Sequence, residues 1–208
     1  MCSKATTDTD LAREVVRRLS GQDGEGRARL AHVRRVVDIV CAIAAGSGWR
    51  RDRAAAVERA AWAHDVLRLE DPDHLRRRIE AAGEEPDPWA LAHAPALLHA
   101  QAAAVWAADR GETDPEVLMA IRHHPTAHPD WGPVGRLLYV ADFCEPGRPF
   151  AERLRTADLR RLAGEGSEGL TVASRRVLAL RVARDTEKER PIHPLSRRAW
   201  EAWKEVAA

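Results

Sequence analysis

The apolar residues of this chain recur at the three- and four-residue intervals of an α-helix, and no β-strand run competes with them. The clearest case is the segment 27–45, where Val33, Val36, Val37 and Val40 form one apolar stripe. A chain patterned in this way buries its apolar side chains by packing helices against one another. The sequence therefore predicts an all-α fold, organised as a helical bundle.

Aspartate and proline residues mark where several of these helices begin and end. Asp52 is the expected N-cap of a helix that runs as far as residues 64–65. Asp71-Pro72 and Asp114-Pro115 each combine an N-cap aspartate with a proline at the first helical position. The helix that begins at residue 114 should end near His124, because a proline disfavours helical geometry at the residue before it.

The remaining segments are expected to be helical as well. Helices are expected over residues 95–109, from Pro133 to the turn at 145–147, twice within 150–186 around a turn at 164–166, and after residue 194. Residues 83–89 should break the helical pattern. Residues 1–26 are expected to form a loosely attached entry helix or flexible segment, and residues 27–208 the main domain.

Composition excludes several classes of protein. The three cysteines show no CxxC spacing, and 33 basic residues nearly balance 32 acidic ones, giving a net charge of +1. We therefore expect neither a disulfide framework nor a nucleic-acid binder. No segment reaches the roughly 18 apolar residues of a membrane span, and the first ten residues lack the order of a signal peptide. The chain is expected to be cytoplasmic, without a membrane partner.

The residues that indicate chemistry are histidines and aspartates placed on separate helices. His64-Asp65 ends one expected helix, and such a dipeptide alone is usually only a helix end. Here four further candidates lie in other expected helices, namely His32, His99, His124 and Asp142. Ligands from packed helices converge in this way in helical metal sites. Four imidazoles and two carboxylates suit two transition ions such as iron, manganese, cobalt or zinc, and do not suit calcium. Asp65, with two oxygens, is the natural bridge between them.

Several segments around these residues resemble motifs of the HD-domain phosphohydrolases, and within them the bacterial YqeK-type diadenosine tetraphosphate hydrolases. The likeness extends over roughly residues 29–196. Its most specific part is the segment Tyr139 to Phe150, which is similar to the family pattern Tyr-Leu-Ala-Asp-x-x-Glu-Pro-Gly-Arg-x-Phe. The other matching segments are 29–36, 62–65, 97–99, 120–126 and 191–195.

The resemblance implies a helical bundle that holds a dinuclear centre, with iron as the expected metal. It implies cleavage of diadenosine tetraphosphate into two ADP, with water activated between two ions about 3.5 to 4 Å apart. The metal ligands would be the six residues named above, and Asp65 would also be catalytic. The expected partner is a dinucleoside polyphosphate, and a homodimer is compatible with the sequence.

The sequence departs from the family pattern at three positions near these motifs. The family lysine three residues after the HD aspartate is Arg68 here, which keeps the charge but changes its shape. His123 replaces a tyrosine and Pro125 a threonine. We expect Arg68 to be catalytic and to contact substrate. The other expected substrate contacts are Arg122, Thr126 and Arg148.

Other interpretations stay open at this point. A related HD nucleotidase or phosphodiesterase could act on dNTPs, mononucleotides or cyclic dinucleotides with the same chemistry. A second alternative is a non-catalytic nucleotide- or metal-binding protein in which Arg68 marks lost activity, and a third is a helical scaffold with incidental histidines. Trp89 and Trp131 lie in expected loops where either ring could stack on a base. His74 is expected on the surface, and residues 191–194 should dock the last helix as a rigid turn.

Overall fold

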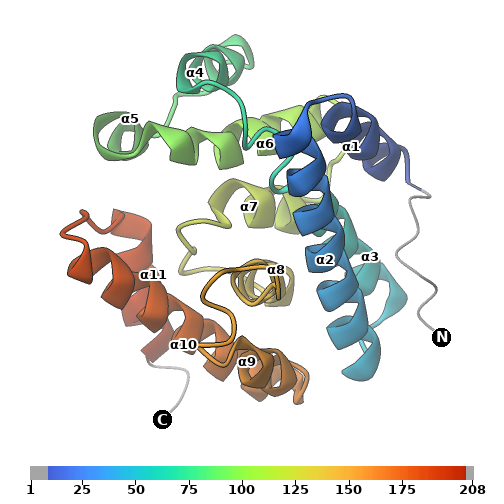
Figure 1. The fold of residues 1–208 in the computed structure, drawn as a ribbon, viewed down its shortest axis with the longest axis vertical. Helices are drawn as coiled ribbons and strands as arrows, with labels where there is room; N and C mark the ends of the chain where they lie inside the picture. The colour runs from blue at the N-terminus through green and yellow to red at the C-terminus, as the bar shows by residue number, and fades with distance from the viewer. Residues whose placement is uncertain (1–8, 205–208) are drawn as a thin grey trace.

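The computed structural model describes residues 9–204, and in that range every regular element is a helix (Figure 1). The prediction of an all-α bundle is confirmed. None of these helices has the length and apolar character needed to cross a membrane. In chain order the helices are α1 Asp10–Ser20, α2 Gly24–Gly46, α3 Arg51–Ala63, α4 Pro72–Ala81, α5 Pro88–His93, the 3-10 helix η1 Pro95–Leu97, α6 Leu98–Ala108, α7 Pro115–His123, α8 Pro133–Phe143, α9 Thr156–Ala163, α10 Gly166–Glu187 and α11 Pro194–Lys204.

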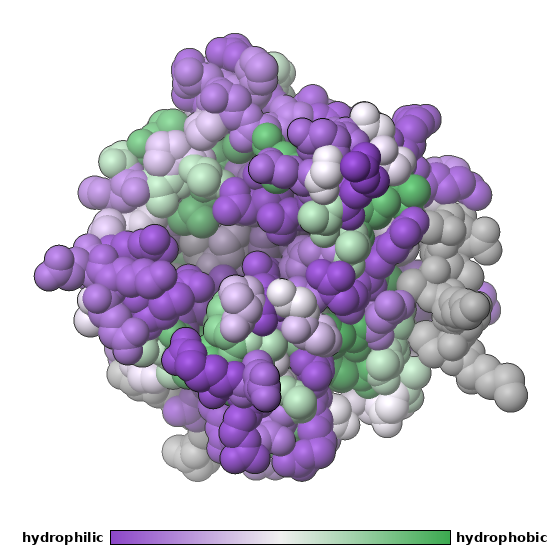
Figure 2. All heavy atoms as spheres, viewed as in Figure 1, coloured by the Kyte–Doolittle hydropathy of each residue, from purple (hydrophilic) through white to green (hydrophobic). Residues whose placement is uncertain are grey.

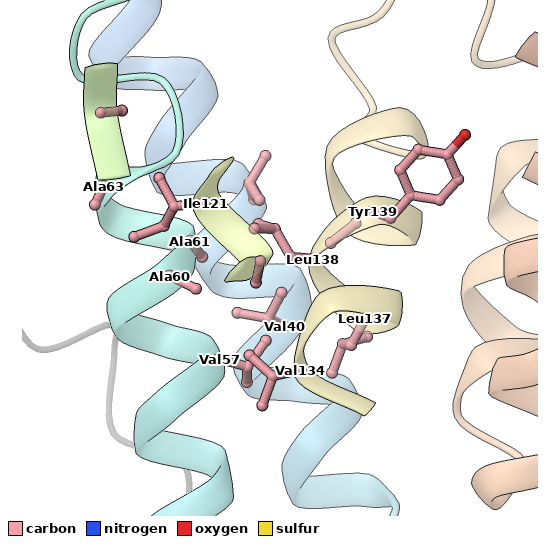
Figure 3. Close-up of a cluster of buried hydrophobic side chains, with 14 of the residues drawn as sticks. Val40, Val57, Ala60, Ala61, Ala63, Ile121, Val134, Leu137, Leu138 and Tyr139 are labelled. Carbon is pink, nitrogen blue, oxygen red and sulfur yellow. The ribbon is translucent and has the colours of Figure 1, made fainter. Parts of the chain in front are cut away.

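Helix α8 is the central element of the bundle. It packs against α2, α3 and α7 on one side and against α9 and α10 on the other (Figure 1). Its residues from Val134 to Phe143, apart from Arg136, are buried. Figure 3 shows Val134 and Leu138 of α8 pointing into a cluster of apolar side chains that α2, α3 and α7 complete. Because several faces of α8 are covered, a polar residue on this helix is held away from bulk solvent.

Aspartate caps fix the starts of several helices, as the sequence predicted. The Asp71 side chain accepts a hydrogen bond from the backbone N–H of Asp73, and Asp114 accepts one from Glu116. Pro72 and Pro115 follow these caps at the first helical positions. Helix α7 ends at His123, as expected, although the next residue, before the proline, keeps helical dihedral angles with φ −52° and ψ −29°.

Two expectations about individual segments were wrong. Asp52 is not an N-cap, because α3 begins one residue earlier and Arg50 precedes it. The segment 83–89 does not only break the pattern, because α5 begins inside it. The Asp87 side chain starts that helix by accepting hydrogen bonds from the N–H groups of Trp89 and Ala90. Trp131 lies in a loop, as expected, but of the two uses left open for its ring it has the structural one, since it is 4% exposed and packs against Tyr139 and Trp203.

The N-terminal helix is more firmly packed than the sequence indicated. We expected a loosely attached helix around Leu11 to Leu19, and α1 does occupy that segment. Its apolar residues Leu11, Ala12, Val15 and Leu19 are nevertheless buried, and the helix packs against α2 and α3. The amphipathic face of α1 thus joins the core. The division into segments 1–26 and 27–208 stays a prediction, and residues 1–8 lie outside the described residues.

Candidate metal centre

The structure brings together the six side chains that the sequence selected as metal ligands. His32 lies on α2, His64 and Asp65 at the end of α3, His99 on the first turn of α6, His124 just after α7, and Asp142 on α8. All six are buried, with 0 to 6% of their surface exposed. Two groups of close ligand atoms occur among them, His32 with His64 and Asp142, and His64 with Asp65 and His124.

The Asp65 carboxylate lies between two pairs of histidines. Its Oδ2 is 3.6 Å from the Nε2 atoms of both His32 and His64. Its Oδ1 is 3.3 Å from Nε2 of His99 and 3.5 Å from Nε2 of His124. Each oxygen therefore faces a different imidazole pair, which is the arrangement that a carboxylate needs to bridge two cations.

Asp142 completes only one side of this arrangement. Its Oδ1 lies 3.2 Å from Nε2 of His32 and 3.9 Å from Nε2 of His64. On the other side, the Nε2 atoms of His99 and His124 are 3.3 Å apart. The two halves of the cluster thus differ in composition, because the first has a second carboxylate and the second does not.

Hydrogen bonds on the far side of each imidazole fix which nitrogen carries the proton. The Nδ1 atoms of His64, His99 and His124 lie 2.6 to 2.9 Å from the carbonyl oxygen three residues earlier. A carbonyl can only accept, so each Nδ1 is the protonated donor and each Nε2 keeps a lone pair. His32 follows the same pattern through Glu145, whose Oε2 is 3.2 Å from Nδ1. The four Nε2 lone pairs are therefore available inside the cluster.

The ionisation states suit a divalent transition metal. Burial lowers the pKa of His64 to about 3 and also lowers that of His99, so both imidazoles are neutral at neutral pH. Burial would raise the pKa of Asp142, but Arg148 above all, then His32 and Arg181, hold it well below its usual value. Among the described residues, Nε2 of His32 and of His64 are buried without a hydrogen-bond partner. Neutral imidazoles with carboxylates are the donors that borderline divalent ions prefer, so the residues fit such ions.

Three arginines neutralise the two carboxylates. Nη1 of Arg29 is 2.6 Å from Asp65 Oδ2, and Nη2 of Arg181 is 2.9 Å from Asp142 Oδ2. Arg148 pairs with the other oxygen of Asp142, and its Nε donates to the Asp142 carbonyl at 3.2 Å. The sequence reasoning assigned no role to Arg29 or Arg181. A signal for Arg29 exists in the sequence, because it opens the family-like segment 29–36, three residues before His32. No local pattern distinguishes Arg181 from the other arginines of its helix.

The cluster adjoins a cavity of about 540 Å³, which Asp65, His99, His124 and Asp142 help to line. The face drawn in Figure 2 is hollowed near its centre, with hydrophilic residues around the hollow. Seven cationic residues line the cavity against three carboxylates. The seven cations are Arg29, Arg68, Arg148, Arg181, Arg184, Lys188 and Arg190. Such an excess of positive charge suits a polyanionic ligand.

The four expected substrate contacts are not placed alike. Arg68, Thr126 and Arg148 line the cavity beside the cluster. Arg122 does not line it, and its Nη2 instead lies 2.7 Å from Glu84 Oε1 in an ion pair at a neighbouring pocket. The structure thus brings three of the four residues to the carboxylates and histidines.

The neighbouring pocket has about 390 Å³ and is more apolar. It shares Trp89, Leu97, Pro125, Thr126 and His193 with the first cavity, so the two spaces adjoin. The His193 Nδ1 accepts a hydrogen bond from the backbone N–H of residue 195, and its Nε2 therefore donates to Asp87 at 3.0 Å. This pair ties the start of α11 to the start of α5, which agrees with the expected docking turn.

Comparison with known proteins places these observations in context. The model of the HD domain matches residues 29–147. Proteins named symmetrical bis(5'-nucleosyl)-tetraphosphatase are similar to the chain, 33% identical over 102 residues in Halalkalibacterium halodurans and 33% over 94 residues in Bacillus subtilis. These matches cover 48% and 45% of this chain and 54% and 50% of the relatives, so the chain spans about half the length of each relative.

The fold is also similar to a solved structure. A crystal structure from Clostridium acetobutylicum, described as a "predicted HD superfamily hydrolase involved in NAD metabolism", superposes with a TM-score of 0.79. The match covers 93% of this chain and 97% of the other, with 23% sequence identity. At that identity the likeness concerns the fold alone.

Proposed function

The chain belongs to the HD domain family, and we propose that it is a metal-dependent phosphohydrolase that cleaves diadenosine tetraphosphate symmetrically into two ADP. The observation that carries this proposal is the buried Asp65 carboxylate, which faces one histidine pair with each oxygen and opens on a cavity rich in cations. The names of the relatives supply the substrate. The alternative of another phosphoester or anhydride substrate uses the same cluster and differs only in the surrounding pocket.

The distances suggest how the six ligands would divide between two ions. One ion would be held by His32, His64, Asp142 and Oδ2 of Asp65, and the other by His99, His124 and Oδ1 of Asp65. When bound, such ions acidify a water and polarise a phosphoryl oxygen. We favour iron because of the family resemblance, and manganese, cobalt and zinc suit the same donors.

The residues of the chain would orient the substrate and balance its charge. Arg68 lines the cavity one helical turn after Asp65, and within the described residues it pairs with no carboxylate. Its guanidinium is thus the best placed to contact the scissile phosphate and the charge that develops on it. Arg148 lines the same cavity while paired with Asp142. We therefore propose a double role for Arg148, holding a metal ligand and contacting phosphate.

The neighbouring pocket supports a nucleoside at the end of the phosphate chain. It is predominantly apolar, adjoins the cationic cavity and carries the Trp89 ring, which a purine base can stack on. Trp89 lies on α5 and is held by edge contact with His193, with ring centroids 4.6 Å apart. A nucleoside bound there would direct its phosphates to Asp65. Hydrolysis between two phosphates requires this placement, because the scissile bond has to lie at the cluster.

The alternative of a non-catalytic nucleotide-binding protein has less support. A protein without catalytic activity would tolerate substitution of the ligand residues. Here all six side chains come together, with the Nε2 atoms and the carboxylates directed into the cluster. A helical scaffold with incidental histidines is disfavoured for the same reason. Burying four imidazoles and two carboxylates in one cluster costs folding free energy, and a scaffold would gain nothing that offsets this cost, whereas bound metal ions would.

Incubation with diadenosine tetraphosphate in ¹⁸O-labelled water tests the proposal. Each turnover breaks one P–O bond and adds one solvent oxygen, so symmetrical cleavage gives one labelled and one unlabelled ADP. Products are resolved by chromatography and mass spectrometry, with Asp65→Asn as the inactive variant and the exposed His74→Ala as its control. ATP plus AMP as main products, or faster turnover of a dNTP or cyclic dinucleotide, would refute the proposed substrate in favour of another HD nucleotidase.

A further inference from the structure

Helix α10 presents a row of cations to the cavity of the metal centre. Arg181, Arg184 and Lys188 all line that cavity, at positions three and seven residues apart. On an α-helix this spacing keeps the side chains near one face. The rise per residue places Arg184 about 4.5 Å further along the axis than Arg181. Lys188 follows as the C-cap residue, directly after the last residue of the helix, Glu187. The row therefore leads away from Asp142 toward the end of the helix.

The first member of the row is anchored at the metal centre. Nη2 of Arg181 is 2.9 Å from Asp142 Oδ2, and its guanidinium carbon lies 4.8 Å from the centroid of the Tyr139 ring. Only 15% of the Arg181 side chain is exposed, and its Nε is buried without a hydrogen-bond partner among the described residues. The guanidinium is thus held in place, with donor capacity left over.

The outer members are progressively less neutralised. Arg184 lies 3.3 Å from Asp185, a half-exposed neighbour on the same helix. Lys188 is exposed, and in the part of the chain that the structure describes it forms no ion pair. Like charges three or four residues apart on one helix face repel and destabilise it. Their proximity to the negative C-terminal end of α10 offsets some of this repulsion.

We propose that Arg181, Arg184 and Lys188 form a phosphate ladder, a site for the part of a linear polyphosphate chain that extends away from the scissile bond. The proposal rests on the proposed function, because the metal centre fixes where the chain begins. The ligand class is an unbranched anion of three or more phosphates. Successive phosphates, each in contact with one of the three side chains, would neutralise their positive charges and so relieve the repulsion between them. The ladder thereby favours long phosphate chains over a single phosphate.

Titration with inorganic anions tests the ladder separately from catalysis. Phosphate, pyrophosphate and tripolyphosphate are titrated calorimetrically into the full chain as purified, without added metal. Arg184→Gln and Lys188→Gln are compared with Arg176→Gln, an exposed arginine of the same helix outside the cavity. Each ladder variant should lose about two- to fivefold in affinity for tripolyphosphate, as expected for one exposed cation, and less for phosphate. In the double variant the affinity for tripolyphosphate should fall by the product of the fold losses of the two single variants.

Thermal unfolding separates this role from a purely structural one. If the two cations only stabilise the C-terminal end of α10, Arg184→Gln and Lys188→Gln should lower the Tm and leave tripolyphosphate affinity as it is in Arg176→Gln. That result would overturn the ladder. Arg181→Lys, which keeps the charge near Asp142, should retain more tripolyphosphate affinity than Arg181→Gln if the charge is what the anion contacts.

The ladder and the proposed function fail in different ways. If the protein converts diadenosine tetraphosphate to two ADP but the ladder variants bind tripolyphosphate like Arg176→Gln, the ladder is refuted and the proposed function stands. If the wild type binds tripolyphosphate more tightly than phosphate, the ladder variants lose that preference, and no cleavage occurs, the ladder is supported and the proposed function is refuted.

Discussion

Replacing Glu145 with glutamine should weaken metal binding, although Glu145 is not one of the six predicted ligands. Glu145 is 1% exposed and stands three residues after Asp142. Its Oε2 faces the Nδ1 of His32 at 3.2 Å. Its Oε1 accepts hydrogen bonds from Nε of Arg35 and, at 2.6 Å, from the backbone N–H of Gly147. All three partners are donors, and only a carboxylate can accept from every one of them.

A glutamine cannot reproduce this arrangement in either orientation of its amide. With the amide NH₂ toward His32, the imidazole must accept at Nδ1, so its proton moves to Nε2 and blocks the predicted ligand atom. With the amide oxygen toward His32, the NH₂ faces the donors of Arg35 and Gly147. The first orientation damages the metal centre, and the second leaves buried donors unpaired.

The expected magnitudes follow from these contacts. Loss of a hydrogen bond to a charged, buried group costs about 1.5 to 3 kcal/mol of the free energy of unfolding. For a chain of this size that corresponds to a fall in Tm of about 3 to 12 °C. Changing an outer partner of a ligating histidine lowers metal affinity by about 10- to 100-fold, or about 1.4 to 2.7 kcal/mol.

Glu112 provides a matched control elsewhere in the fold. Its side chain is 6% exposed, it accepts a hydrogen bond from Nε of Arg59 at 2.7 Å, and it accepts one from the backbone N–H of Asp114 at 3.0 Å. This repeats the contacts of Glu145 with an arginine and with the N–H two residues later. Neither Arg59 nor Asp114 is a predicted ligand. Glu112→Gln should therefore cost stability without changing metal affinity.

Metal affinity is measured by competition with a chromophoric chelator, and stability by thermal unfolding of the same samples. The reasoning requires Glu145→Gln to lose affinity while Glu112→Gln keeps it. Equal affinity in the two variants, at comparable losses of Tm, would refute the claim that Glu145 fixes the His32 tautomer. A Glu145→Gln protein with unchanged Tm and unchanged affinity would show that the carboxylate is not needed at all.

Further outcomes follow from the same geometry. Asp65→Asn should reduce the metal content found by elemental analysis by at least one ion per chain, because an amide supplies no second anionic oxygen, and His74→Ala should leave it unchanged. Arg68→Lys should keep most of kcat/KM while Arg68→Ala lowers it, and equal values in both would assign Arg68 to the surface. Arg148→Ala should lower kcat/KM by roughly 2 to 4 kcal/mol of transition-state free energy, and an effect on Tm alone would make its role structural. Removal of metal by a chelator should lower the free energy of unfolding by about 2.7 kcal/mol, compared with protein in free metal at a hundred times its Kd. An unchanged Tm would exclude a tightly held ion.

The sequence predicted the fold and the six residues that meet because both depend on local signals. Caps and prolines mark the helix ends, so His64, Asp65 and His124 can be placed at helix termini before any packing is known. The motif from Tyr139 to Phe150 identified Asp142, on the helix that begins at Pro133, as the sixth residue. Histidines on four separate expected helices, together with the resemblance to the family motifs, made the cluster predictable.

Contacts made by side chains far apart in the sequence were not predictable in this way. Arg181 reaches Asp142 across 39 residues, and nothing local distinguishes it from the other arginines of α10. The pairing of Arg122 with Glu84 depends on how the segment before α5 folds back, and that segment was expected to be a breaker. The burial of α1 depends likewise on faces of α2 and α3 that no local pattern identifies.

The alanines of α3 and α6 connect the packing of the bundle to its site. Three of the imidazoles are anchored through Nδ1 to the backbone carbonyl three residues earlier, so each Nε2 can move only with that stretch of backbone. The Nε2 atoms of His99 and His124 nevertheless approach to 3.3 Å, which requires α6 and α7 to pack closely. Small side chains allow such an approach, and α6 buries Ala100, Ala102 and Ala103 beside His99. Alanine contributes less burial free energy than leucine, and the large buried side chains of Trp62 on α3, Trp106 on α6 and Trp203 on α11 offset that deficit. We infer that the small buried side chains of α6 allow the close approach of His99 to His124 that the site demands.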